Sequence, residues 1–314
     1  MSGLAGAPVE STDIDLRFPW TIHLEFAIVS LGLFAFDLVG CRVMGVKTPA
    51  LFPILGTYLV LAAGLQALPV YWHSKGKAKL RDSSSMIIWF GLFVILLPYV
   101  QDVAGRLDVS RGLQDETFTH IDRMLGINVP RMMTWASSTW LGHLVNASYP
   151  LLIPYAYVAF LVPALGGKVK RAQQFVMANF LALFMSVPIF VLWPAVGPWV
   201  GYHFAPDPSQ AQCQADLLHI RALGLYLHHP AGIVCLPSGH TMESIFACVV
   251  TWNYRWLRIP SVALSLSIIL STMTTGWHYF IDVLGGAVVA FASLALAGRL
   301  VNHHLDTSTR IAEQ

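Results

Sequence analysis

The sequence is poor in charged residues. Asp, Glu, Lys and Arg make up 11% of the 314 residues, whereas 55% are hydrophobic, and the mean hydropathy is +0.60. Soluble domains rarely combine so little charge with so much apolar content. The net charge is +2, and no basic patch is interleaved with aromatic residues, so nothing indicates a nucleic-acid partner. The composition predicts one polytopic membrane domain.

The N-terminal segment 1–20 lacks the basic region that precedes the apolar stretch of a cleavable signal peptide, and it carries acidic residues instead. We therefore expect the first apolar block to remain as a membrane span. An internal repeat and low-complexity tracts are also absent from the sequence. The missing repeat argues against a secondary transporter, because many transporter folds are built from repeats.

Eight apolar blocks follow one another along the chain, and most approach the roughly 20 residues that cross a bilayer as a helix. They are 22–40, 51–71, 86–104, 149–165, 175–195, 238–256, 261–277 and 281–301. The fourth block is short, and an earlier start near Leu141 fits the pattern. The predicted fold class is all-α, a polytopic bundle of about eight spans.

The charges between the blocks predict the orientation. Three short connections are rich in Lys and Arg: 73–82, 166–174 and 253–258. With eight spans they share one side, which the positive-inside rule assigns to the cytoplasm. The tails 1–21 and 302–314 are then cytoplasmic, and the long connections 105–148 and 196–237 lie on the outer side.

The first long connection, 105–148, mixes charges with Trp and Met. One interpretation is a helix in the plane of the interface, with Trp135 and Trp140 at the level of the lipid head groups. The other is an ordinary folded outer loop.

The predicted topology brings three ionisable residues to one depth on the outer face: His240, His278 and Asp282. Such residues near a membrane are usually functional or paired. His278 and Asp282 are four residues apart, which places them on one face of a helix. The Asp can fix the imidazole tautomer and leave the other nitrogen as a nucleophile. His240 can then protonate the leaving oxygen as a general acid.

The turn "PSGH" at 237–240 adds a candidate phosphate site, since Ser238 and Gly239 stand where a helix begins and its N–H groups are free. Glu243 either tunes the pKa of His240 or is a first-turn acid favoured by the helix dipole. Metal binding is the competing use of two His and an Asp. We expect neither a metal nor a cofactor.

These motifs resemble those of the type 2 phosphatidic acid phosphatase (PAP2) superfamily. "PSGH" at 237–240 matches its second motif, and "HYFIDVLGG" at 278–286 fits the end of its third. The resemblance implies His278 as nucleophile, Asp282 as its orienting group and His240 as general acid. It also implies a six-helix catalytic core at 86–301, preceded by two extra helices at 22–85.

The basic residues of two superfamily motifs are missing. Ser271-Thr272 stands where a Ser-Arg pair is usual, and "VLWPAVGPWVGYHF" at 191–204 has no Lys or Arg for the first motif. Both departures look like the inositol-phosphorylceramide synthase branch. A phosphodiester carries one negative charge and needs fewer cations than a monoester.

The resemblance thus implies a membrane enzyme that moves a phosphorylated head group from a phospholipid to a lipid alcohol through a phosphohistidine. The alternatives are a lipid phosphate phosphatase, a phospholipase-C-like hydrolase and, from another class, a proton-linked transporter. Arg123 is either a phosphate ligand or the partner of Asp122 in an interfacial ion pair. A disulfide between Cys213 and Cys235 and two free thiols there are both compatible with the sequence.

Overall fold

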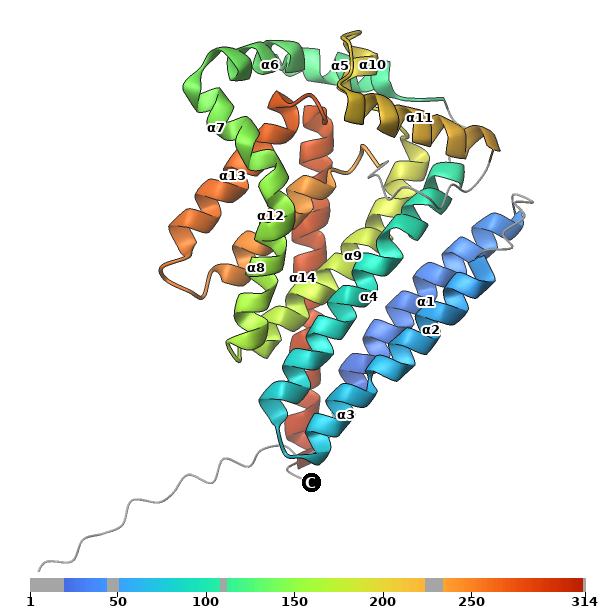
Figure 1. Ribbon diagram of the computed structural model, residues 1–314, viewed down its shortest axis with the longest axis vertical. Coiled ribbons are helices and arrows are strands. Elements are labelled where there is room, and N and C mark those ends of the chain that lie inside the picture. The colour runs from blue at the N-terminus through green and yellow to red at the C-terminus, as the bar shows by residue number, and fades with distance from the viewer. Residues whose placement is uncertain (1–19, 44–50, 108–111, 224–233, 313–314) are drawn as a thin grey trace, which may run out of the picture.

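The computed structural model describes residues 20–43, 51–107, 112–223 and 234–312, and over these residues every regular element is a helix (Figure 1). Five of the segments are long and apolar enough to cross a membrane: His23–Gly40, Ala78–Leu107, Trp140–Leu165, Val169–Leu192 and Phe280–Asn302. The all-α class is therefore confirmed, and the chain has the features of a multi-pass membrane protein.

The N-terminal helices lie side by side along one side of the bundle (Figure 1). Helix α1 (Trp20–Val43) is followed by α2 (Leu51–Leu65) and α3 (Ala67–Ser74), which are separated at Gln66. The predicted span 51–71 is thus divided between two helices. Helix α4 (Ala78–Leu107) then returns along the bundle and packs against both α1 and α3.

Helix α9 (Val169–Leu192) is the centre of the packing. It contacts α1, α4, α8 (Leu152–Leu165), α12 (Gly239–Thr251) and α14 (Phe280–Ala312). Aromatic side chains of α9 pack against those of three neighbouring helices, α1, α4 and α8. The ring centroids are 4.6–6.5 Å apart in the pairs formed by Phe26, Trp89, Phe90, Phe93, Phe160, Phe175 and Phe180. Helix α9 in turn packs against α12 and α14, at whose first turns the candidate site lies.

The remaining predicted spans differ from the observed helices at their ends. Helix α7 (Trp140–Ser148) and the short 3-10 turn η2 (Tyr149–Leu151) run into α8, so the apolar segment starts near Leu141. Helix α12 has 13 residues and is shorter than the predicted block 238–256, whereas α13 (Arg258–Thr274) has the 17 residues of the block 261–277 but begins and ends three residues earlier. Helix α14 continues beyond residue 301, where we had expected the tail to begin.

The long connections contain short helices that lie across one end of the bundle, where α12 and α14 begin (Figure 1). These are α5 (Asp115–Met124), α6 (Val129–Ser138), α10 (Pro198–Gly201) and α11 (Pro208–Leu223). Trp135 in α6 is 38% exposed and Trp140 at the start of α7 is 78% exposed. Both indoles are thus available at the bundle surface.

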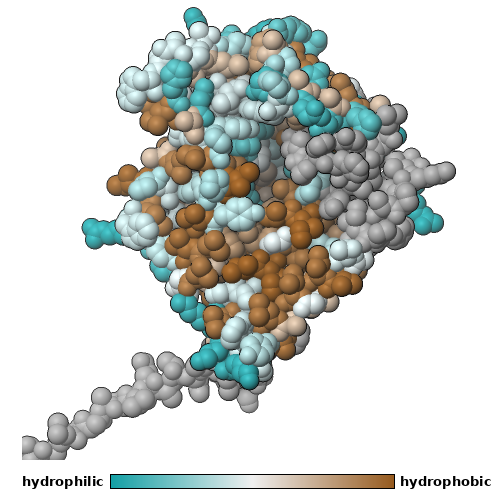
Figure 2. All heavy atoms as spheres, viewed as in Figure 1, coloured by the Kyte–Doolittle hydropathy of each residue, from teal (hydrophilic) through white to brown (hydrophobic). Residues whose placement is uncertain are grey.

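Hydrophobic side chains cover the middle of the molecular face in Figure 2, and hydrophilic ones gather towards its ends. Large apolar residues are exposed on the long helices, among them Ile153 at 67%, Val288 at 69% and Phe291 at 61%. A soluble surface rarely carries so many. A hydrocarbon environment accounts for their exposure.

Candidate active site

His278 lies in the tight turn between α13 and α14. The carbonyl of Thr272 accepts hydrogen bonds from the backbone N–H groups of Trp277 (2.9 Å) and His278 (3.0 Å), and Gly276 has a φ of +78°. Glycine suits this left-handed conformation, which side chains rarely adopt. A Cβ at position 276 would also come within 2.9 Å of the Met133 sulfur. The turn therefore holds the imidazole, which is buried, in one place.

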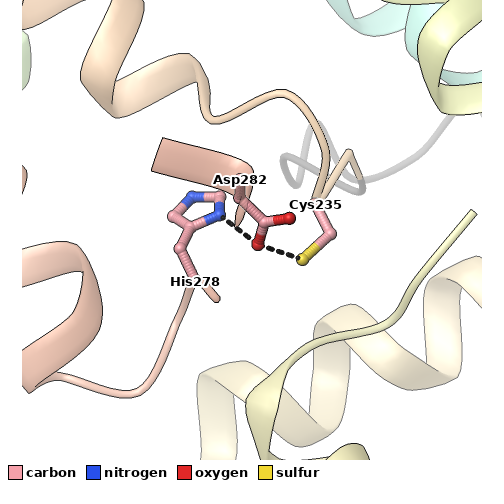
Figure 3. A group of neighbouring side chains, drawn as sticks. All are labelled: Cys235, His278 and Asp282. Atoms are coloured by element: carbon pink, nitrogen blue, oxygen red, sulfur yellow. Dashed lines mark hydrogen bonds and ion pairs between the residues drawn. The ribbon is translucent and has the colours of Figure 1, made fainter. Parts of the chain in front are cut away.

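Asp282 has both a structural and an orienting contact. Its Oδ2 accepts a hydrogen bond of 2.8 Å from the backbone N–H of Tyr279, which satisfies one free donor at the start of α14. The same oxygen lies 3.3 Å from Nδ1 of His278 (Figure 3). Asp282 is fully buried, so its carboxylate cannot turn to solvent. The helix cap thus aims the carboxylate at the imidazole.

Cys235 is a third partner of this carboxylate, and sequence reasoning had not found it. Its thiol donates to Oδ2 of Asp282 over 2.9 Å (Figure 3). Burial, with the nearby carboxylate, raises the pKa of the Cys235 thiol well above its usual value, which keeps the S–H as a donor.

The ligand atoms of Cys235, His278 and Asp282 all lie within 4.8 Å of one another. These are types that zinc binds, although this set has Cys235 where we had considered His240. The hydrogen bonds between the three side chains account for their closeness. Cys213 and Cys235 are both buried, and no disulfide joins them.

The "PSGH" turn is joined to α14 through the main chain. The backbone N–H of Ser238 donates to the carbonyl of Asp282 over 3.0 Å, and Ser238 Oγ accepts from the N–H of Thr241, capping α12. The close approach requires glycine at 286, where a Cβ would lie 2.6 Å from the Ser238 carbonyl oxygen. The Ser238 side chain is therefore occupied as a helix cap, whereas Gly239 is exposed.

His240 follows this turn and faces His278. The two ring centroids are 6.0 Å apart at 60°. The ring of Tyr149 stacks on His240 with a centroid distance of 4.4 Å. The stacking covers one face of the His240 ring, and the nitrogen atoms at the ring edge can still contact a ligand between the two histidines.

Helix α5, one of the helices that lie across the end of the bundle, packs against the site and supports it. Its buried residues recur at helical spacing: Asp115, Phe118, Thr119 and Asp122. Asp122 accepts a hydrogen bond of 3.1 Å from the N–H of Phe280, so a second carboxylate caps α14. Burial, and to a lesser extent the nearby Asp282, raise the pKa of the Asp122 carboxyl to about 6.

Asp115 anchors the segment 193–197 to the same turn. Its carboxylate accepts from the backbone N–H groups of Val196 (3.1 Å) and Gly197 (2.9 Å) and from the hydroxyl of Tyr279 (3.0 Å). Burial raises the pKa of the Asp115 carboxyl. Sequence analysis had not singled out Asp115. The signal that could have found it is a pair of acids seven residues apart, 115 and 122, which lie on one face of an amphipathic helix.

A cavity of about 700 Å³ opens beside the two histidines. His240, Gly239, His278 and Tyr149 line it at one end, and its walls continue along α4, α8, α9 and α12 with mostly apolar side chains. Among the described residues that line it there is no lysine or arginine. The cavity thus has two imidazoles at one end and an apolar remainder suited to the hydrocarbon part of a lipid.

The two remaining candidate residues are placed differently. Arg123 is exposed, and its guanidinium lies 5.4 Å from the ring centroid of Tyr202, away from the cavity lining. Glu243 lines the cavity one helical turn beyond His240. Ser271 and Thr272, which replace the usual Ser-Arg pair, are buried, and their hydroxyls donate to the carbonyls of Ile268 and Ile269.

This arrangement is suited to nucleophilic chemistry. If Nδ1 of His278 is protonated and donates to Asp282, its Nε2 carries the lone pair. His240 is placed to exchange a proton with a group bound between the rings. The start of α12 adds backbone N–H groups at the same point.

Comparison with known proteins agrees with the geometry. A family model described as the PAP2 superfamily matches residues 116–296, more than half of the chain. No curated protein and no solved structure matches the chain. The matched segment contains His240, His278, Asp282 and the supporting Asp122, and it begins one residue after Asp115. Members of the superfamily are phosphatases and phosphotransferases, and this chain belongs to the PAP2 superfamily.

Proposed function

We propose that the protein is a lipid phosphotransferase that moves a phosphorylated head group from a phospholipid to a lipid alcohol. One observation carries the proposal: His240 and His278 open into the same apolar cavity, whose described lining has no lysine or arginine. A dianionic monoester would call for such cations, whereas a phosphodiester has a single charge.

The reaction would proceed in two balanced steps. Nε2 of His278 bonds to phosphorus, the bond from phosphorus to the glycerol oxygen breaks, and His240 gives that oxygen a proton. The acceptor hydroxyl then passes its proton to His240, its oxygen bonds to phosphorus, and the P–N bond breaks. Asp282 stabilises the positive charge that the His278 ring carries in the intermediate.

The candidate site lies at the end of the bundle that carries α5, α6, α10 and α11, opposite the α3–α4 and α8–α9 connections (Figure 1). Those connections hold the Lys and Arg of 73–82 and 166–174. The positive-inside rule therefore supports a site on the outer face, with both termini in the cytoplasm.

The test is to incubate the purified protein with a panel of phospholipids, with and without ceramide, diacylglycerol or inositol. We expect the phosphorylated head group to be transferred to a lipid alcohol. Release of inorganic phosphate would instead indicate a monoester phosphatase, and release of the phosphorylated head group into water a hydrolase. His278→Ala is the control, and wild-type turnover by this variant would refute the proposal.

A further inference from the structure

Glu243 is a carboxyl group in an otherwise apolar wall. The residues of α12 that line the cavity beyond its first turn are Met242, Glu243 and Phe246, which share one face of the helix. Among the described lining residues, Glu243 alone carries a carboxyl group, and none is a lysine or arginine. Within the described lining, this group therefore has no permanently charged residue of opposite sign beside it.

The Glu243 side chain also has an unsatisfied oxygen. Its Oε2 is buried and has no hydrogen-bond partner among the described residues. Leaving such a group unpaired costs free energy. A carboxyl oxygen accepts hydrogen bonds whether the group is ionised or protonated, so a ligand that brings a donor would satisfy it.

The neighbouring wall formed by α9 offers acceptors as well. Asn179 and Ser186 of α9 are buried and line the same cavity. The Ser186 hydroxyl donates to the carbonyl of Ala182 over 2.7 Å, and the Asn179 amide donates to that of Phe175 over 3.0 Å. Both groups act as donors in these bonds, and the oxygen atom of each side chain has lone pairs that can accept a hydrogen bond. This region of the cavity is thus matched to a ligand with hydrogen-bond donors.

Glu243 lies deeper in the cavity than the reacting groups. It follows His240 by three residues, which places it about 4.5 Å further along the axis of α12. A phosphorus atom held between the histidines would have its head group towards the bundle end and its lipid part towards Glu243. The glycerol backbone of a diacyl phospholipid has no donor at that depth.

Resting on the proposed function, we propose that Glu243 selects the acceptor: a lipid alcohol with a second hydrogen-bond donor, an amide N–H or another hydroxyl, beside its reacting hydroxyl. Ceramide has this pattern, and diacylglycerol, with one hydroxyl and two esters, does not. Glu243 is then a specificity-determining residue of the second step.

The experiment compares acceptors on the purified full-length protein with one phospholipid donor. The readout is the ratio of kcat/KM for ceramide to kcat/KM for diacylglycerol. We expect the wild type to favour ceramide and Glu243→Leu to lose roughly 10- to 100-fold of that ratio, as for a lost hydrogen bond to a charged or buried group. Glu243→Asp should retain part of the preference. Glu116→Gln, which removes an exposed carboxyl of α5, is the matched control and should keep the full ratio.

The wild type alone gives a second measurement that needs no folded variant. Ceramide analogues that are N-methylated or lack the second hydroxyl should be poorer acceptors than ceramide, mainly through KM. Equal use of all analogues by the wild type, or an unchanged ratio in Glu243→Leu, would overturn the inference. The transferase proposal would then still stand, and Glu243 would have a water molecule as its hydrogen-bond partner. Absence of transfer to any acceptor would instead refute the proposed function.

Discussion

The variant Asp282→Asn separates the charge of Asp282 from its hydrogen bonds. All three donors, from Tyr279, Cys235 and His278, converge on Oδ2. Oδ1 is buried without a partner in the described structure. An asparagine can therefore place its oxygen at the Oδ2 position and keep every hydrogen bond, while its NH₂ group takes the unpartnered position.

The magnitude follows from the distance of 3.3 Å between His278 Nδ1 and Asp282 Oδ2. With an effective dielectric constant of about 20, unit charges at that distance attract by roughly 5 kcal/mol. In the proposed mechanism the His278 ring is positively charged only once phosphorylated, so the loss falls on the intermediate and the transition states that flank it. Since about 1.4 kcal/mol corresponds to a tenfold change in rate, we expect kcat/KM to fall by about 10³-fold.

The assay is head-group release or transfer from the best donor of the phospholipid panel, with thermal unfolding measured in parallel. Asp282→Asn should unfold within a few degrees of the wild type, whereas Asp282→Ala should lose about 2 kcal/mol or more because Tyr279 N–H loses its acceptor. An Asn variant with kcat/KM within about tenfold of the wild type would refute the assigned role of the carboxylate.

Three further predictions test other parts of the site. His240→Gln should slow phospholipid turnover by about 10²- to 10⁴-fold but slow a nitrophenyl ester far less, because nitrophenolate leaves without a proton; equal losses on both would contradict the general-acid role. The pKa of Asp122 is raised to about 6 in the folded protein, so between about pH 4 and pH 6 the folded state holds a proton that the unfolded chain has released. The free energy of unfolding of the wild type should therefore fall by on the order of 2 kcal/mol as the pH rises through this range, and level off above it. Asp122→Asn should lack this fall, as thermal unfolding across the range will tell. Gly286→Ala should cost about 1–3 kcal/mol because its Cβ meets the Ser238 carbonyl oxygen, whereas Gly91→Ala, in open space, should be near neutral in the same denaturation assay.

Much of the bundle could be predicted from the sequence because a membrane helix leaves a continuous apolar signal. The blocks 22–40, 86–104, 175–195 and 281–301 each lie mostly within one observed helix. The block 238–256 was less informative, because apolar and aromatic residues continue through the turn that follows Thr251. Hydropathy records burial in lipid or protein, and it does not record where hydrogen bonding ends a helix.

The site was predictable to the extent that its residues are local in sequence. His278 and Asp282 are four residues apart, and His240 stands in a recognisable turn. Tyr279 and Asp115 are 164 residues apart and Cys235 and Asp282 are 47 apart, yet each pair is hydrogen-bonded. Such contacts depend on how helices pack, which a single sequence does not display.

The backbone bond between Ser238 and Asp282, made possible by Gly286, has a mechanical consequence. It joins the turn before α12, which carries His240, to the first turn of α14, next to His278, main chain to main chain. These two residues are the proposed general acid and the proposed nucleophile. A motion that widens the cavity to admit a lipid would then keep these two turns together and displace the lining helices α4, α8 and α9 instead. In the proposed mechanism, His240 and His278 would thus keep their spacing while the cavity admits a lipid.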